Sequence, residues 1–334
     1  MKNKIKILFI CPGGQTNLNS PSELLAKFIN DNYDYIDITI YNQTFNRAPN
    51  TAKGYDLVWG DMDGHNVPQL ALSLSSKSKI PCYIHAEWIP PYRWEKGWSD
   101  YFNEPTNLSQ RKKYELNIDA MKEADLVSLA IDKTPGGFEF IKERTGIIFK
   151  NSFVRYPACK KYDFINTTRK NQISTIARAN DGKKRIKDTM EAIHLSKSKP
   201  IFKIIGGINI KHKDVTVKSM GSFNEDHKVN IFAESKLSVQ HWSGIPPAES
   251  IQQFCPVISY DIPYMRELYG DSLIWVEKDN VQSLSETIDY WMTHDEEREQ
   301  FAKKAFDLFT NNKLGVKLEK YRAELLIEKI KTIL

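Results

Sequence analysis

The sequence has few cysteines and few turn-forming residues for its length. Its 334 residues include 4 cysteines, 16 glycines and 15 prolines. Gly and Pro at this level exclude a collagen-like or low-complexity chain. The cysteines form no C-x-x-C pair, which argues against a disulfide framework and predicts buried thiols at Cys11, Cys82, Cys159 and Cys255.

The sequence also lacks a long apolar run. No stretch approaches the ~20 apolar residues that a membrane-spanning helix needs. The basic amino terminus leads into the short run Ile7–Cys11, which ends at Pro12-Gly13-Gly14 without the cleavage site of a secretory signal. We therefore predict a buried first strand and a cytoplasmic protein.

The positive charge of the chain is concentrated in one segment. Residues 169–218 contain 13 Lys and Arg against 4 Asp and Glu, a net charge of +9, so the remainder of this +5 chain carries −4. With 41% apolar residues the composition is that of a globular protein. The asymmetry favours an anionic ligand bound at this segment over a basic surface for nucleic acid or membrane.

Short apolar runs alternate with segments of helical periodicity. The predicted strands are Ile5–Cys11, Tyr35–Tyr41, Asp56–Trp59, Cys82–His85, Asp125–Ile131 and Gly146–Val154, then Gln172–Ala177, Ile201–Ile205, Val215–Met220, Leu237–Gln240, Pro256–Ser259 and Ser272–Val276. This alternation indicates βαβ units and parallel sheets. The polar segment Tyr162–Asn171 interrupts the pattern and predicts a linker between two domains. Leu284–Leu334 reads as helix, with breaks near Thr293 and Gly315.

Three segments carry candidate ligand-binding chemistry. Gly13 and Gly14 follow the first strand and would let backbone N–H groups approach a ligand, but the segment is not G-x-G-x-x-G and a plain tight turn is an equal alternative. Arg178, Lys183 and Lys184 follow the first strand of the second domain. Arg and Lys together suit a diphosphate, with a solvated helix face as the alternative.

The third segment is residues 241–250, HWSGIPPAES. Gly244 allows close backbone approach, and Pro246 with the next proline opens a helix. Glu249 falls in the first turn of that helix, where it can accept hydrogen bonds from hydroxyl groups. The alternative is that Glu249 only complements the helix dipole.

The stretch Leu237–Leu268 resembles the signature region of the GT-B glycosyltransferases, specifically the GT4-like retaining group. Residues 244–250, GIPPAES, resemble the family's G-[LI]-P-P-x-E-A, and residues 255–261, CPVISYD, resemble G-x-P-V-[IV]-[AS]-x-D. The strand that ends at His85, the strand at 124–127 (ADLV), and Arg178 with Lys183 or Lys184 resemble further family motifs in the same order.

This resemblance implies a complete domain organisation. We expect an α/β protein with two Rossmann-like βα domains facing across a cleft. Residues 1–165 would form the acceptor-side domain, residues 166–315 the nucleotide-sugar donor domain, and residues 316–334 a helix that packs back on the first domain.

The resemblance also implies roles for individual residues. Arg178 and Lys183, or Lys184 if the turn aligns one residue later, would contact the donor diphosphate, and Glu249 would bond its ribose. The remaining implied contacts on the donor are Gly13, Gly14, His85, Ser243, Gly244, Ile245 and Pro246. Separately from the resemblance, the aromatic residues Trp88, Tyr92 and Trp94 lie in a proline-rich loop, where we expect them to stack on the acceptor, with capping of the first domain as the alternative. His241 departs from the family, because it occupies the first Glu position of E-x7-E, which normally contacts the donor sugar.

The implied reaction is transfer of a hexosyl or related group from a UDP- or GDP-linked sugar to a hydroxyl acceptor, with retention and without metal or cofactor. The acceptor would be a glycan, a lipid-linked molecule or another hydroxyl compound, which allows a peripheral contact with the inner membrane face. The alternatives are glycosylation of modified DNA bases, a sugar-nucleotide epimerase, and a non-catalytic sugar-nucleotide binder, the last motivated by His241. A nucleic-acid acceptor is not favoured, because the basic segment lies in the donor domain.

Overall fold

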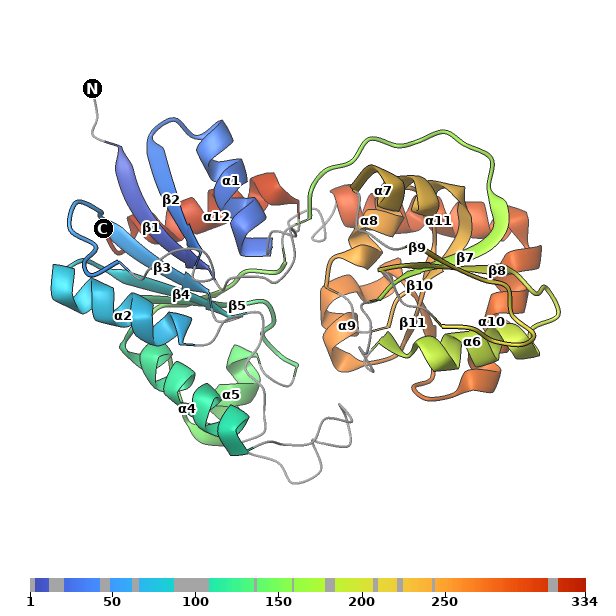
Figure 1. Cartoon of the computed structure of the whole chain (residues 1–334), viewed down its shortest axis with the longest axis horizontal. Coiled ribbons are helices and arrows are strands. Elements are labelled where there is room, and N and C mark those ends of the chain that lie inside the picture. The colour runs from blue at the N-terminus through green and yellow to red at the C-terminus, as the bar shows by residue number, and fades with distance from the viewer. Residues whose placement is uncertain are drawn as a thin grey trace. The chain divides into compact units, whose positions relative to one another are not determined.

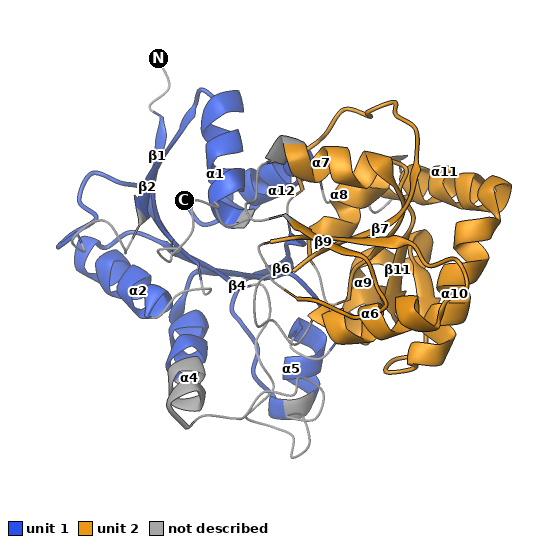
Figure 2. Cartoon of the chain, turned by 45° about the vertical axis from the view of Figure 1, so that its right-hand side comes forward, with its two compact units in different colours: residues 1–158, 317–334 blue, residues 159–316 orange. Residues whose placement is uncertain are grey.

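The computed structural model divides into two α/β units (Figures 1 and 2). The first unit comprises residues 1–158 and 317–334, and the second comprises residues 159–316. The structure describes residues 4–11, 21–42, 49–61, 66–86, 108–134, 137–157, 159–177, 184–206, 210–220, 225–241, 244–311 and 318–334.

The first unit is built on a six-stranded parallel sheet. Its strands are β1 (Ile5–Cys11), β2 (Ile36–Asn42), β3 (Leu57–Asp61), β4 (Cys82–Ala86), β5 (Leu126–Leu129) and β6 (Ser152–Val154), in the order β2-β1-β3-β4-β5-β6. Its helices are α1 (Pro21–Asn32), α2 (Val67–Ser78), α4 (Leu108–Glu123), α5 (Phe138–Thr145) and α12 (Glu319–Lys331).

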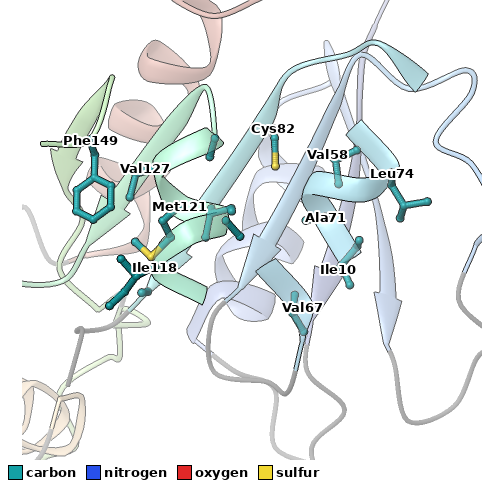
Figure 3. Close-up of a cluster of buried hydrophobic side chains, with 14 of the residues drawn as sticks. Ile10, Val58, Val67, Ala71, Leu74, Cys82, Ile118, Met121, Val127 and Phe149 are labelled. Carbon is teal, nitrogen blue, oxygen red and sulfur yellow. The ribbon is translucent and has the colours of Figure 1, made fainter. Parts of the chain in front are cut away.

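Helices cover both faces of this sheet, so its strands are apolar on both sides. In β1, Leu8 and Ile10 belong to the core under α2 and α4, which Figure 3 shows, while Ile7 and Phe9 belong to the core under α1 and α12. Alternate residues of each strand therefore face opposite helix layers. By the same alternation Tyr83 and His85 of β4 point to the α1 and α12 side.

The carboxyl-terminal helix α12 belongs to the first unit, although the second unit precedes it in sequence (Figure 2). It packs against α1 and adds Ala323, Leu326, Ile327 and Ile330 to the first unit's core. The chain thus crosses from the first unit to the second and returns.

The second unit is built on another parallel sheet of six strands. They are β7 (Lys170–Ile176), β8 (Ile201–Ile205), β9 (Val217–Met220), β10 (Ser235–Val239), β11 (Val257–Tyr260) and β12 (Ile274–Val276), in the order β12-β11-β10-β7-β8-β9. This is the Rossmann strand order. The helices are α6 (Ile186–Leu195), α7 (Glu225–Glu234), α8 (Pro246–Gln252), α9 (Pro263–Tyr269), a 3-10 turn (Gly270–Ser272), α10 (Val281–Thr293) and α11 (Asp295–Asn311).

The predicted fold class, two Rossmann-like βα domains with a returning carboxyl-terminal helix, is confirmed. The four cysteines are buried free thiols, as predicted. The break near Thr293 is confirmed, since α10 ends there, and the one near Gly315 lies outside the described residues. Among the described residues, no helix combines the length and apolarity that crossing a bilayer requires.

The predicted linker at 162–171 is wrong at its carboxyl end. β7 already begins at Lys170, whose side chain and that of Asn171 are exposed, so the apolar pattern of the strand starts two residues late. The segment before β7 is fastened to the second unit. The N–H of Tyr162 donates to Oε1 of Gln252 at 2.9 Å, and the N–H of Ile165 donates to Oε1 of Gln253 at 3.0 Å.

Candidate active site

The strand order of each sheet identifies where a ligand is expected. The order reverses between β1 and β3 in the first unit and between β7 and β10 in the second. In doubly wound sheets, ligands bind outside the carboxyl ends of the strands at such switch points. The candidate site residues lie at or after the carboxyl ends of β1 and β4 in one unit and of β7 and β10 in the other.

The predicted site residues divide into two groups. Gly13, Gly14, Trp88, Tyr92, Trp94, Arg178, Lys183 and Ser243 lie outside the described residues. His85 is in β4, Lys184 lies two residues before α6, His241 follows β10, Gly244 and Ile245 precede α8, and Pro246 and Glu249 are in α8. The structure thus brings His241, Gly244 and Glu249 to the β10–α8 segment of one unit and places His85 in the other.

His85 is buried in a polar cluster at the carboxyl end of the first sheet. Its Nδ1 atom is 2.8 Å from Oγ of Ser128 in β5, and Nε of Arg155, which follows β6, donates to the same Nδ1 at 3.2 Å. Ser128 Oγ is also 2.6 Å from the hydroxyl of Tyr83. Burial, and next the Arg155 guanidinium, hold the pKa of His85 well below 6.5, so the ring is neutral.

The returning helix α12 places a second guanidinium near this cluster. Arg322 is 1% exposed, and its guanidinium lies 4.9 Å from the ring centroid of Tyr156. Burial, and next the charge of Arg155, lower the pKa of Arg322 to about 9. Two buried guanidinium groups therefore lie at this end of the first unit, together with the buried Asp61 at the end of β3.

Glu249 is buried in the second unit and is paired with a lysine. Nζ of Lys228 in α7 is 2.5 Å from Oε1 of Glu249, and both side chains are under 10% exposed. The hydroxyl of Tyr162 donates to the same oxygen at 3.4 Å. This arrangement holds the Glu249 carboxylate in a fixed position.

His241 is buried at the end of β10 and lies flat on Tyr260. The ring centroids are 4.0 Å apart, and the N–H of Tyr260 donates to Nδ1 of His241 at 3.0 Å. Within the described residues, the buried Nε2 atom has no hydrogen-bond partner. Burial, and next the charges of Arg185 and Lys184, lower the pKa of His241 to about 3. His241 is therefore neutral, and its Nε2–H can only donate.

Arg185 is the last residue of the basic turn and directly precedes α6. Arg185 precedes the helix with a φ of 49°, and its guanidinium binds Asp188 at 2.8 Å and also Asp279. Asp188 in turn accepts from the hydroxyl of Tyr260 at 3.1 Å. Because Arg185 forms ion pairs with two carboxylates, the candidate phosphate-binding residues of this turn are Arg178, Lys183 and Lys184.

Local sequence explains the backbone around Gly244. Pro246 and Pro247 occupy the first turn of α8, where a missing N–H costs nothing. The carbonyl of Gly244 accepts a hydrogen bond from the hydroxyl of buried Tyr269. This contact ties the segment before α8 to α9.

A metal-like group occurs elsewhere in the second unit. Among the described residues, His194, His212 and Asp214 have potential ligand atoms within 4.8 Å of one another. His194 is in the last turn of α6, the end that leads into β8. The group therefore lies at the amino edge of the sheet, away from the candidate site.

Several site residues have no local signal in the sequence. Ser22, Ser128 and Arg155 reach the His85 cluster from α1, β5 and the residue after β6, and Lys228 reaches Glu249 from α7. Of these residues, only Arg155 could have been suspected from the sequence, because it directly follows a strand at the carboxyl edge of the sheet. The other contacts depend on which strands and helices become neighbours.

A family model matches most of the second unit. Residues 163–308 match the family model described as "Glycosyl transferases group 1". A comparison with curated protein sequences gave no match. The matched residues include the candidate residues Lys184, His241, Gly244 and Glu249.

Solved structures share the fold of the whole chain. Sucrose-phosphate synthase (tll1590) from Thermosynechococcus elongatus has a TM-score of 0.76 at 10% identity, covering 98% of this chain and 99% of its own. Alr3699/HepE from Anabaena, solved with UDP and glucose, has a TM-score of 0.73 at 12% identity, covering 98% and 100%. TarM from S. aureus, solved as a point mutant with fondaparinux, alpha-GlcNAc-glycerol and UDP, has a TM-score of 0.61 at 14% identity, covering 93% and 58%. The family match and these folds confirm the resemblance to GT-B glycosyltransferases.

Proposed function

We propose that this chain, a GT-B glycosyltransferase by its group 1 match and its fold, moves a hexosyl or related group from a nucleoside-diphosphate donor to a hydroxyl acceptor. The observation that carries the proposal is the buried Lys228–Glu249 pair beside the end of β10, within the matched domain. The GT4-like character, retention and independence of metal come from the resemblance in the sequence.

The donor diphosphate is assigned to the turn between β7 and α6. Arg178 and Lys183, or Lys184, supply a planar fork and a point charge, a usual pair for phosphate oxygens. The same cations would stabilise the negative charge that develops on the leaving nucleoside diphosphate. We propose a UDP- or GDP-linked sugar, and the UDP in the HepE and TarM structures supports the first of these.

Glu249 is assigned to the ribose of the donor. An ionised carboxylate accepts hydrogen bonds from neighbouring hydroxyl groups, and the ribose of a nucleotide offers two. Lys228 and Tyr162 fix the carboxylate and offset its charge inside the domain. The segment Ser243–Pro246 is assigned to the sugar through its backbone.

His85 is assigned to the transferred sugar, with the Gly13-Gly14 turn on the same donor. Because the ring is neutral, it contributes a hydrogen bond and no full charge. His241 is likewise neutral and presents an N–H donor, whereas a Glu at this position would be an acceptor. We propose that His241 selects a donor whose group at this position accepts a hydrogen bond.

The acceptor is assigned to the first unit. Aromatic side chains such as Trp88, Tyr92 and Trp94 can stack on a sugar ring. A glycan, lipid-linked or other hydroxyl compound is the proposed class, and the saccharide ligands named for TarM support a glycan. We keep a cytoplasmic location, with a contact at the inner membrane face, as part of this proposal.

Donor binding tests the assignment directly. Purified protein is titrated with a panel of UDP- and GDP-sugars by calorimetry and assayed for slow donor hydrolysis without acceptor. Arg178→Ala and Glu249→Ala should each weaken binding at least about tenfold. Lys187→Ala, which removes an exposed lysine of the same basic segment, is the matched control and should bind normally.

The outcomes separate the alternatives. Binding with hydrolysis supports the transferase, whereas binding with interconversion of sugar epimers indicates an epimerase, and binding without turnover indicates a non-catalytic binder. Steeply salt-dependent binding of duplex DNA would support a DNA acceptor. Failure to bind any nucleoside-diphosphate sugar, or normal binding by both alanine variants, would refute the roles assigned to Arg178 and Glu249.

A further inference from the structure

Four buried side chains form a chain of hydrogen bonds around His85, and which group donates in each bond cannot be seen from the sequence. Tyr83 and His85 come from β4, Ser128 from β5, and Arg155 from the residue after β6. All four side chains are at most 3% exposed. Water is largely excluded from the cluster, so its polar groups depend on one another for hydrogen bonds.

The direction of each hydrogen bond follows from the chemistry of arginine. A guanidinium has only donors, so Nδ1 of His85 must accept from Nε of Arg155 across 3.2 Å. A hydrogen on Nδ1 would point at another N–H group. The neutral ring therefore carries its hydrogen on Nε2.

The two hydroxyl groups complete the same order. Because Nδ1 has no hydrogen, Ser128 must donate to it across 2.8 Å, and Ser128 Oγ then accepts from Tyr83 across 2.6 Å. Two donors thus converge on the lone pair of Nδ1. The cluster allows one tautomer of His85.

Arg155 is itself held in place by other parts of the first unit. Its Nη2 donates to Oγ of Ser22 at 2.6 Å, and its guanidinium lies 5.4 Å from the ring centroid of Trp59. Among the described residues, no carboxylate forms an ion pair with Arg155. The buried Asp61 of β3 pairs with His85 in the sheet register, and the charges of Arg155 and Arg322 oppose a second proton on the ring.

We propose that Arg155 is a positioning residue that holds His85 in the Nε2–H tautomer, so that His85 donates a hydrogen bond to an oxygen of the transferred sugar. The second half of this statement rests on the proposed function; the first does not. In this state Nε2 already carries a hydrogen, so His85 cannot take the proton of the acceptor hydroxyl. Arg155 thereby restricts His85 to binding and orientation.

The tautomer can be measured without any substrate. Full-length protein labelled with ¹⁵N at histidine is examined by long-range ¹H–¹⁵N correlation between pH 5 and 8, and His85 is assigned by the signal lost in His85→Gln. We expect a non-protonated Nδ1 and a protonated Nε2 over the whole range. A protonated Nδ1, or a doubly protonated ring at pH 6, in the wild-type protein would overturn the proposal.

Variants test whether Arg155 is the cause. Arg155→Met should produce a mixture of tautomers, while burial continues to hold the pKa of the ring below its ordinary value. Arg322→Met is the matched control, because it removes an equally buried guanidinium of the same unit that does not bond His85. An unchanged tautomer in Arg155→Met, or the same change in Arg322→Met, would refute the assignment. If Arg155→Met does not fold, the tautomer of His85 is measured in Arg155→Lys and compared with that in the wild-type protein, and this comparison tests the proposal.

Activity separates this proposal from the proposed function. With a donor that the wild-type protein turns over, Arg155→Met should lower kcat about tenfold or more with a smaller change in KM. The double variant Arg155→Met/His85→Gln should be no worse than His85→Gln alone. If no donor is turned over but the tautomer behaves as described, the transferase proposal fails and the positioning role stands.

Discussion

Replacing Lys228 by methionine should strongly destabilise the second unit. Lys228 and Glu249 form a 2.5 Å ion pair with side chains 8% and 5% exposed. Removal of one partner of a buried pair leaves the other charge uncompensated, which typically costs about 3–5 kcal/mol. Methionine keeps the length and much of the volume of the lysine stem, so the loss reports the charge more than a cavity.

The free energy of unfolding is measured by urea denaturation of the full chain, with hydrogen exchange of peptides from residues 225–260 reporting on the second unit. Lys228→Met/Glu249→Gln removes both charges and should recover most of the loss. Lys170→Met is the matched control, because Lys170 and Glu234 form a 2.7 Å pair with side chains 57% and 32% exposed. That variant should change stability by less than about 1 kcal/mol.

The pH dependence gives the sign of the effect. In Lys228→Met, proton uptake by the buried Glu249 carboxylate removes the uncompensated charge. The folded state then binds more protons than the unfolded state, so the destabilisation shrinks as the pH falls. A loss below about 1 kcal/mol in Lys228→Met, or a double variant as unstable as the sum of both single variants, would refute the reasoning.

Three further predictions concern other buried groups. Arg169→Met should cost about 3 kcal/mol in urea unfolding, because the guanidinium donates to carbonyl oxygens at the ends of α7 and α8; a loss under ~1 kcal/mol would contradict this. Burial lowers the pKa of His241 to about 3, so between pH 6.5 and 3 the unfolded chain takes up a proton that the folded chain does not. The free energy of unfolding should therefore decrease as the pH is lowered, by up to ~1.4 kcal/mol per pH unit. His241→Phe should reduce this slope in urea titrations at several pH values. Burial raises the pKa of the Cys11 thiol to about 12, and it also raises the pKa of the Cys82 thiol. A thiol reagent at pH 7.5 should therefore label neither cysteine in the native protein. Rapid labelling of either would contradict this prediction.

Much of the fold was predictable because it depends on local patterns. The run Ile5–Cys11 is apolar almost throughout, since both faces of β1 are covered by helices, and the sequence predicts its bounds correctly. Strand ends with polar residues were harder to predict. β7 begins at Lys170, where exposed side chains carry no apolar signal.

The candidate site was predictable only in part. Gly244, Pro246 and Glu249 belong to one short segment with a recognisable order, and the family match includes it. The lysine that pairs with Glu249 comes from α7, 21 residues earlier. Nothing local marks Lys228 among the 47 Lys and Arg residues of the chain.

The sequence by itself determined the alternation of strands and helices, the two sheets, and which strand ends carry chemistry, because these follow from periodicity and from the order of residues along the chain. The tertiary structure alone decided the state of the site residues. His85 becomes a neutral ring with a defined tautomer because β4, β5 and the residue after β6 meet at one edge. Charge, protonation and hydrogen-bond direction depend on distances in space, and residues as far apart in sequence as Ser22 and Arg155 set them.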